Sequence, residues 1–193
     1  LDERRRVHEL VADTAAGRIP LMAQTSHHVF EDCVGLSNHA EEIGFDLAIV
    51  MNPYFPPQPS DDLVRAWYQA LDQHTDIPTF LFNTAYSGYT LSPELISELA
   101  DLDIICGIKN PKSREHLMAV HDLCADRIVV CDASEGEWLD SWRHFPISGG
   151  PADVRLFPDR DVGFYARGFA PGGERRLALQ HFTGEGGGPF LPN

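Results

Sequence analysis

Residues 103–109, with the sequence DIICGIK, decide the fold that we expect for this chain. The apolar run from Ile104 to Ile108 ends in a single charged residue, Lys109. A short continuous apolar run is typical of a strand in a parallel sheet that is covered on both faces. The segment 113–123 that follows has helical spacing, so this part of the chain predicts a strand followed by a helix.

The same strand–helix unit recurs along most of the chain. Strands are predicted at 19–23, 46–51, 77–82, 103–109 and 127–132. Helices are predicted at 2–16, 30–43, 60–71, from Ser92 onward, at 113–123 and at 136–142. This alternation predicts an α/β fold with a parallel sheet, either an open doubly wound sheet or a barrel. No GxGxxG or GxxxxGKS/T motif follows a predicted strand, which disfavours the nucleotide-binding forms of the open sheet.

The composition excludes several classes of protein. The chain has 193 residues and a net charge of −14, from 29 acidic and 15 basic residues, so we expect no nucleic-acid partner. No apolar run reaches the length of about 18 residues that a membrane span needs. The four cysteines form no CxxC pair, and we interpret them as buried reduced thiols. A cytoplasmic location is the expectation that follows.

The motifs at the predicted strand ends resemble a known family. In order along the chain they are ERRRVHELV (3–11), RIPLMAQTS (18–26), AEEIGFDLAIVMNPYF (40–55), DIPTFLFNTAYSG (76–88), SPELISELADLDIICGIKN (92–110) and RIVVCDASE (127–135). From Glu3 to about Asp140 the chain resembles the dihydrodipicolinate synthase / N-acetylneuraminate lyase family. The resemblance implies an incomplete (β/α)8 TIM barrel in which strands three to seven are recognisable.

The resemblance also implies the chemistry. Lys109 matches the family's catalytic lysine, which forms a Schiff base with pyruvate or another 2-keto acid in a class I aldolase or lyase. The position fits independently, because active sites of such barrels lie at the carboxyl ends of the strands. An amine in an apolar mouth loses preference for its charged form and becomes a nucleophile. We expect no metal and no cofactor, since the lysine itself supplies the electron sink, and a homo-oligomer is implied by the resemblance.

Five further residues are predicted to line the substrate pocket. Asn83 and Thr25 are interpreted as polar wall residues, and Tyr54 as a packing or substrate-side aromatic residue. The other two are Phe82 and Tyr86.

Three departures from the family pattern weaken the expectation of dihydrodipicolinate synthase activity. Phe82 stands where the family has its proton-shuttling tyrosine, and a phenyl ring carries no exchangeable proton. Phe55 stands where the family has a second tyrosine, often contributed across a subunit interface. The segment 84–89 contains no arginine to bind a substrate carboxylate.

Other side chains are candidates for the missing acid–base group. Tyr86 and Tyr89 lie in the loop after Phe82, and His27 and His28 follow the strand at 19–23. For all four, exposure or packing is the competing interpretation. The spacing marks no metal partners for the two histidines.

The family's first two strands, with their Gly-Ser/Thr-Thr-Gly-Glu turn, and its eighth strand are not recognisable. We divide the chain into a partial barrel at 1–145 and an irregular Gly/Pro-rich tail at 146–193. Three interpretations of the missing strands stay open. In the one that we favour, the sequence is part of a longer protein. In the other two, it is a truncated product completed by oligomerisation, or residues 148–193 supply substitute strands. Two functions stay open: a Schiff-base enzyme, and an inactive relative that binds a ligand or a partner protein.

Overall fold

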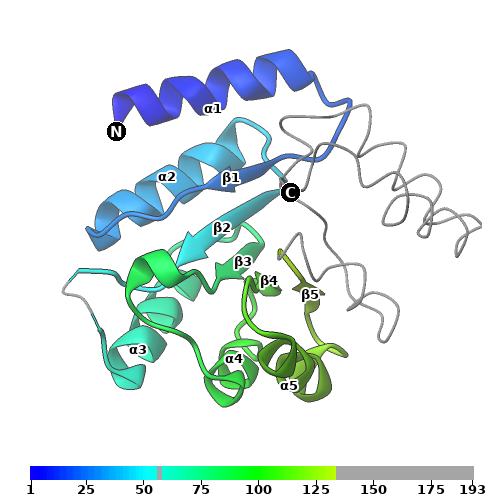
Figure 1. Cartoon of the computed structure of the whole chain (residues 1–193). Helices are drawn as coiled ribbons and strands as arrows, with labels where there is room; N and C mark the ends of the chain where they lie inside the picture. Colours follow the sequence, from blue (N-terminus) through cyan, green and yellow to red (C-terminus); the bar gives the residue numbers. More distant parts are fainter. Residues whose placement is uncertain (56–57, 134–193) are drawn as a thin grey trace, which may run out of the picture. The chain divides into compact units, whose positions relative to one another are not determined.

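The computed structural model describes residues 1–55 and 58–133 of the chain. Helices and strands alternate through the described residues (Figure 1). The elements are α1 (Asp2–Ala15), β1 (Met22–Gln24), α2 (Phe30–Glu42), β2 (Leu47–Met51), α3 (Asp61–Asp72), β3 (Thr79–Phe82), the short 3-10 helix η1 (Ala85–Ser87), α4 (Pro93–Leu99), β4 (Ile105–Lys109), α5 (Arg114–Cys124) and β5 (Val129–Cys131). The predicted helix at 136–142 and the tail at 146–193 lie outside the described residues.

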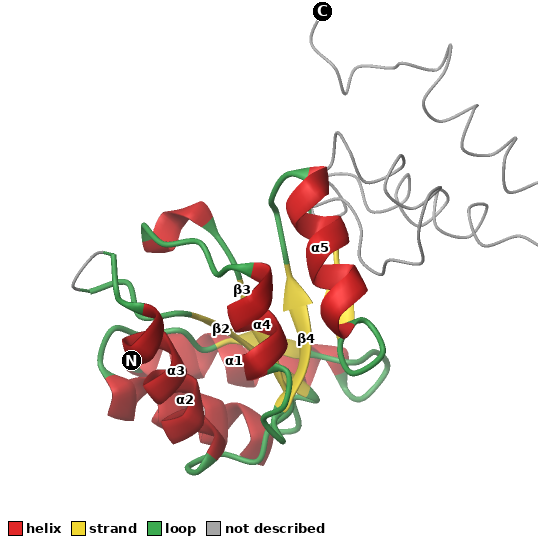
Figure 2. Cartoon of the chain, turned by 90° about the horizontal axis from the view of Figure 1, so that it is seen from below, coloured by secondary structure: helices red, strands yellow, loops and turns green. Residues whose placement is uncertain are grey.

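The order of the strands decides between the two predicted architectures. All four strand pairs are parallel, and the strands lie in the sheet in their chain order, β1-β2-β3-β4-β5. Each crossover therefore steps in the same direction, and right-handed crossovers then place every connecting helix on one face of the sheet. Figures 1 and 2 show this helical layer along the outside of the curved sheet. A doubly wound sheet reverses its strand order, so the structure supports the barrel.

The two faces of the sheet are packed differently. Side chains that point toward the helices are almost completely buried, as Val50, Leu81 and Ile108 show. On the opposite, inner face the Phe80 ring lies over Gly107, where an added Cβ would be only 2.3 Å from the Phe80 Cζ. Glycine at this position therefore makes room for the aromatic ring.

Serine residues begin three of the helices, as the sequence predicts. The hydroxyl oxygens of Ser60, Ser92 and Ser113 accept hydrogen bonds from the backbone N–H of the third residue in α3, α4 and α5. Each cap satisfies one of the N–H groups that a helix start leaves unpaired.

All five strands begin one to three residues later than predicted, and β1 and β3 are two examples. β1 starts at Met22 and not at Ile19, which is 62% exposed, and β3 starts at Thr79 and not at Ile77. In both segments a proline, Pro20 or Pro78, precedes the observed start. Proline has no N–H to donate to the sheet, so the apolar run extends beyond the strand.

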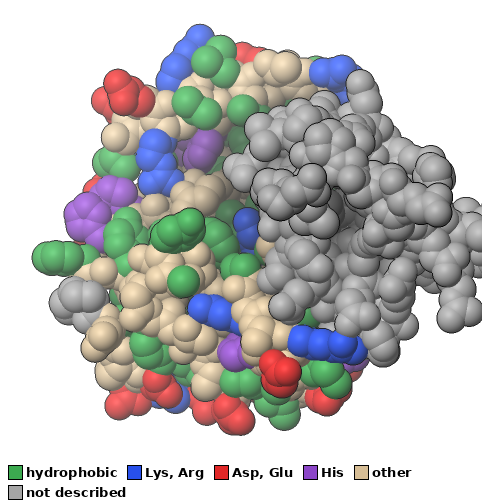
Figure 3. All heavy atoms as spheres, viewed as in Figure 1, with side chains coloured by type: hydrophobic (Ala, Val, Ile, Leu, Met, Phe, Trp, Pro, Cys, Tyr) green, Lys and Arg blue, Asp and Glu red, His purple; other side chains and the backbone are tan. Residues whose placement is uncertain are grey.

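The apolar face of α1 is only partly covered. Val7, Leu10 and Val11 are between 42% and 56% exposed. Together with five further residues they border an open groove of about 400 Å³; these are Thr14, Ala15, Arg18, Ile19 and Leu21. Figure 3 shows hydrophobic side chains exposed on this part of the surface.

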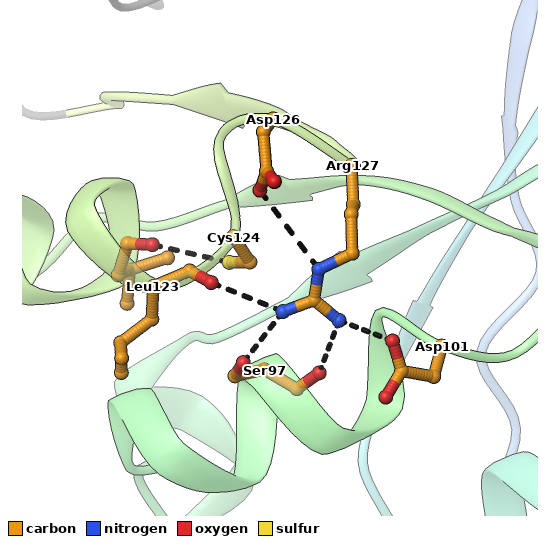
Figure 4. Close-up of polar contacts among 7 residues, drawn as sticks. Ser97, Asp101, Leu123, Cys124, Asp126 and Arg127 are labelled. Carbon is orange, nitrogen blue, oxygen red and sulfur yellow. Dashed lines mark hydrogen bonds and ion pairs between the residues drawn. The ribbon is translucent and has the colours of Figure 1, made fainter.

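Arg127 connects the ends of three elements just before β5 (Figure 4). Its guanidinium donates to the carbonyl oxygen and the hydroxyl of Ser97 in α4, at 2.9 and 2.6 Å, and to the carbonyl oxygen of Leu123 in α5, at 3.0 Å. It also pairs with Asp101. These contacts fix the start of β5 against both helices, at the end of the strand opposite to its carboxyl terminus.

No helix in the described ranges is long and apolar enough to cross a membrane. All four cysteines are free, as predicted; Cys33 and Cys124 are buried, whereas Cys106 and Cys131 are half-buried.

Candidate functional site

Lys109 lies in a row of strand-end residues on the inner face of the sheet. The register pairs Met51 of β2 with Phe82 of β3, Phe82 with Lys109 of β4, and Lys109 with Cys131 of β5. Residues paired across neighbouring strands point to the same face. The four side chains therefore form one wall at the carboxyl edge, where sites of parallel α/β proteins occur.

Phe82 is in direct contact with Lys109, and the predicted role of both residues in a substrate pocket stays a prediction. The Lys109 Nζ lies 4.7 Å from the centroid of the Phe82 ring. The face of an aromatic ring attracts an ammonium group at this distance. The ring therefore positions the amine, but it has no hydroxyl to transfer a proton.

Cys131 is a member of the site that the sequence did not single out. Burial raises the pKa of its thiol to about 11; the Asp132 carboxylate adds to this rise and Lys109 opposes it. The thiol is thus a neutral neighbour of the amine at neutral pH. The sequence could have indicated Cys131, because this residue lies near the end of the next predicted strand, at 127–132.

Asn83 is positioned by hydrogen bonds behind the wall. Its side chain is fully buried and donates to the Oδ1 of Asn110 at 2.9 Å. It points to the opposite side of the sheet from Phe82, because successive side chains in a strand alternate. The structure therefore gives Asn83 an internal polar partner, and its predicted contact with substrate stays a prediction.

The two loop tyrosines lie away from the amine. The Tyr86 side chain is 92% exposed. The Tyr89 hydroxyl donates to the Asp61 carboxylate at the start of α3, and burial together with this carboxylate raises the pKa of Tyr89 to about 12. Neither arrangement supplies a phenol to Lys109.

Tyr54 and the two histidines form a separate aromatic group above β1 and β2. The His27 and His28 rings stack with centroids 4.4 Å apart, and Tyr54 meets His28 edge-on at 6.2 Å. The His27 Nδ1 also lies 3.4 Å from a carboxylate oxygen of Asp32 in α2. In the described part of the chain, no three His, Cys, Asp or Glu side chains are grouped to hold a metal ion.

Thr25 points toward the helical layer. Its hydroxyl shares a hydrogen bond of 2.8 Å with the hydroxyl of Ser37 in α2, and both residues are fully buried. The structure does not bring Thr25 to Lys109, and its role as a pocket wall stays a prediction.

Comparison with known sequences supports the family resemblance. The sequence model of the dihydrodipicolinate synthetase family matches residues 1–143. Among curated relatives, the 4-hydroxy-tetrahydrodipicolinate synthase of Pelobacter propionicus is 29% identical over 136 residues, covering 69% of this chain and 47% of the relative. The corresponding enzyme of Desulfotalea psychrophila is 33% identical over 136 residues, covering 69% and 46%. The chain spans about half the length of these relatives.

Solved structures support the fold. Dihydrodipicolinate synthase from Aquifex aeolicus superposes with a TM-score of 0.83 at 20% identity, over 94% of this chain and 63% of that one. The chloride-inhibited enzyme from Acinetobacter baumannii, complexed with pyruvate, gives a TM-score of 0.81 at 20% identity, over 96% and 67%. The predicted fold, part of a (β/α)8 barrel, is confirmed by these matches and by the singly wound sheet. By its sequence match and its barrel segment, the chain belongs to the dihydrodipicolinate synthetase family.

Proposed function

We propose that the protein is a Schiff-base lyase or aldolase that acts on pyruvate or another 2-keto acid, with Lys109 as the nucleophile. The observation that carries the proposal is the place of Lys109, on the inner face at the carboxyl end of β4 in a barrel of this family. Two similar solved structures, the Acinetobacter baumannii enzyme and a prophage protein of this family from E. coli K12, are complexes with pyruvate.

The reaction needs an unprotonated amine and a route for protons. The Lys109 Nζ adds to the keto carbon, and the carbinolamine loses its hydroxyl as water to give an iminium. Loss of a proton from the neighbouring carbon then gives an enamine, whose carbon forms a bond to a second carbonyl compound; the reverse sequence breaks that bond. The iminium stores the electron pair in both directions, so no cofactor is required.

The phenyl ring of Phe82 affects the proton-transfer steps of the proposed reaction. Since its ring cannot donate a proton, the hydroxyl that leaves as water takes its proton from solvent or from another side chain. We therefore propose an activity other than dihydrodipicolinate synthesis, with proton transfer slower than in relatives that have a phenol at this position.

The lysine content of the chain gives a clean test. Lys109 and Lys112 are the two lysines in the sequence. We would incubate the full chain with pyruvate and a series of other 2-keto acids, reduce with borohydride and measure the intact mass. One adduct is expected, which Lys109→Ala abolishes and the matched control Lys112→Arg retains. A folded sample that gives no adduct with any keto acid would sink the proposal.

A second candidate function is an inactive relative that binds a ligand or partner protein. The replacement of a phenol by Phe82 favours it. It predicts calorimetric binding of pyruvate that survives in Lys109→Ala and leaves no adduct after reduction. The Schiff-base enzyme predicts that binding and adduct are lost together.

We also propose that the protein works as a homo-oligomer in the cytoplasm, and that the chain divides into a partial barrel at 1–145 and a Gly/Pro-rich tail at 146–193. Support comes from the family, and from the outer sides of β1 and β5, which have no strand partner among the described residues. Sedimentation of the full chain tests the assembly: a dimer or larger species is expected, and a monomer at micromolar concentration would contradict it.

A further inference from the structure

A closed ring of hydrogen bonds lies behind Lys109. The Leu91 N–H donates to Asn83 Oδ1 at 3.0 Å, and Asn83 Nδ2 donates to Asn110 Oδ1 at 2.9 Å. Asn110 Nδ2 lies 3.2 Å from His116 Nδ1, and His116 Nε2 lies 2.8 Å from the carbonyl oxygen of Leu91. Asn83, Leu91 and Asn110 are fully buried, so their polar groups depend on this ring for partners.

The ring has only one consistent direction. The N–H of Leu91 can only donate and its carbonyl oxygen can only accept. The amide oxygen of Asn83 must therefore face the N–H, which turns its nitrogen to the oxygen of Asn110. The nitrogen of Asn110 then needs a ring nitrogen without a proton. Neutral His116 with its proton on Nε2 is the form that completes the ring.

The ring joins the two strand ends that carry the site. Asn83 directly follows Phe82, and Asn110 directly follows Lys109. The Asn83 N–H also donates to the carbonyl oxygen of Lys109 at 3.1 Å. Because side chains alternate along a strand, Asn83 and Asn110 point away from the inner face and do not meet the amine. Their effect on Lys109 passes through the backbone.

We propose that His116 is a positioning residue for Lys109: through Asn110 and Asn83 it locks the ends of β4 and β3, so that the amine is held at the Phe82 ring. This inference rests on the proposed function for its kinetic part. A misplacement of about 1 Å in a reacting group can cost about 100-fold in rate.

Three substitutions at α5 separate positioning from simple packing. His116→Leu leaves the Asn110 amide nitrogen without its acceptor and removes the closer donor to the Leu91 carbonyl, which keeps a contact of 3.4 Å with Asn83 Nδ2. His116→Gln keeps an acceptor for the first and a donor for the second. His121→Leu is the matched control, with the same change in the last turn of the same helix.

The kinetic test measures borohydride trapping of the pyruvate imine on Lys109 at increasing pyruvate. His116→Leu is expected to lower the saturating rate by about tenfold or more with little change in half-saturating pyruvate, because positioning acts on the chemical step. His116→Gln and His121→Leu should remain within about threefold of the parent protein. A folded His116→Leu protein with the parent rate, or a Gln variant as slow as the Leu variant, would overturn the proposal.

Nitrogen NMR tests the ring without any substrate. The ¹⁵N shifts of His116 should report a neutral imidazole with its proton on Nε2. In Asn110→Asp the carboxylate can only accept, so His116 must donate from both nitrogens and should give imidazolium shifts at neutral pH. A proton on Nδ1 in the parent protein, or an unchanged His116 in Asn110→Asp, would refute the ring.

A chemical probe of Lys109 tests this inference independently of the proposed function. If the parent protein forms no keto-acid adduct, the proposed function fails. Reductive methylation of Lys109 by formaldehyde and cyanoborohydride then reads its positioning. His116→Leu should change that rate relative to His121→Leu, and equal rates in the two variants would overturn the positioning role.

Discussion

The Phe82 ring sets the position of Lys109 without supplying a proton donor. We predict that Phe82→Tyr accelerates imine trapping at Lys109 by at least about tenfold, since a positioned general acid typically contributes about 10²–10⁴-fold. Phe82→Leu, which removes the ring and adds no phenol, should not accelerate it. The trapping rate of both variants would be measured by incubating them with pyruvate and borohydride and quenching samples at a series of times. Equal acceleration in the two would show that the missing hydroxyl is not what limits the site.

The Cys131 thiol should resist alkylation. Its pKa is raised from 9.0 to about 11, so the thiolate needed for reaction forms near pH 11 in the folded protein and near pH 9 in the unfolded chain. A raised thiol pKa stabilises the fold below pH 9, and this contribution is lost as the pH rises through 11. Brief iodoacetamide pulses at several pH values, followed by mass mapping, test the shift. Half-maximal labelling of folded protein near pH 9 would contradict it.

The sequence predicted part of this site at the level of single residues. Lys109, Phe82 and Asn83 could be placed at strand ends because apolar runs mark where strands stop. The contacts of Thr25 with Ser37 and of Asn110 with His116 could not be predicted, because they join side chains from different elements. The exposure of Tyr86 likewise depends on the path of its loop.

At the scale of the elements, Gly107 in β4 leaves room for the Phe80 ring of the neighbouring strand β3. We predict that Gly107→Ala destabilises the protein by about 1–3 kcal/mol, because the new methyl group would overlap the Phe80 ring and overpacking costs about that much. Urea denaturation measures the effect. The same substitution in a Phe80→Leu background should cost clearly less, since the ring that it meets is gone. Additive effects in this double-mutant cycle would refute the steric explanation.

The start of β5 depends on Arg127. We predict that Arg127→Ala lowers the free energy of unfolding by about 1–3 kcal/mol, the range for hydrogen bonds from a charged donor discounted for partial exposure. The control Arg6→Ala breaks an exposed ion pair with Glu9 within α1 and should cost no more than about 1 kcal/mol. Thermal unfolding of both variants gives the comparison. Equal losses would show that the contacts of Arg127 with α4 and α5 add nothing.

Element positions were predictable to within a few residues. The sequence pattern located every helix and strand that the structure describes in 1–55 and 58–133, except η1. The predicted strand starts were one to three residues too early. In β1 and β3, Pro20 and Pro78 interrupt the hydrogen bonding of runs that remain apolar. Hydrophobicity reports burial, whereas a strand also needs N–H groups.

In the whole molecule, the order of the strands was the decisive fact that the sequence pattern left open. Alternating strands and helices are compatible with a doubly wound sheet and with a barrel, and only the sequential order β1-β2-β3-β4-β5 separates them. The family motifs favoured the barrel, because they occur at successive strand ends in family order. The chain nevertheless spans only about half the length of its curated relatives.

We expect Lys109 of this chain to form an imine with a 2-keto acid. The most direct measurement is peptide mass mapping of the full chain after incubation with saturating pyruvate and reduction with borohydride. We predict a reduced pyruvate adduct on Lys109, with Lys112 unmodified in the same peptide. An adduct shared equally by the two lysines, or a folded chain in which neither is modified, would contradict it.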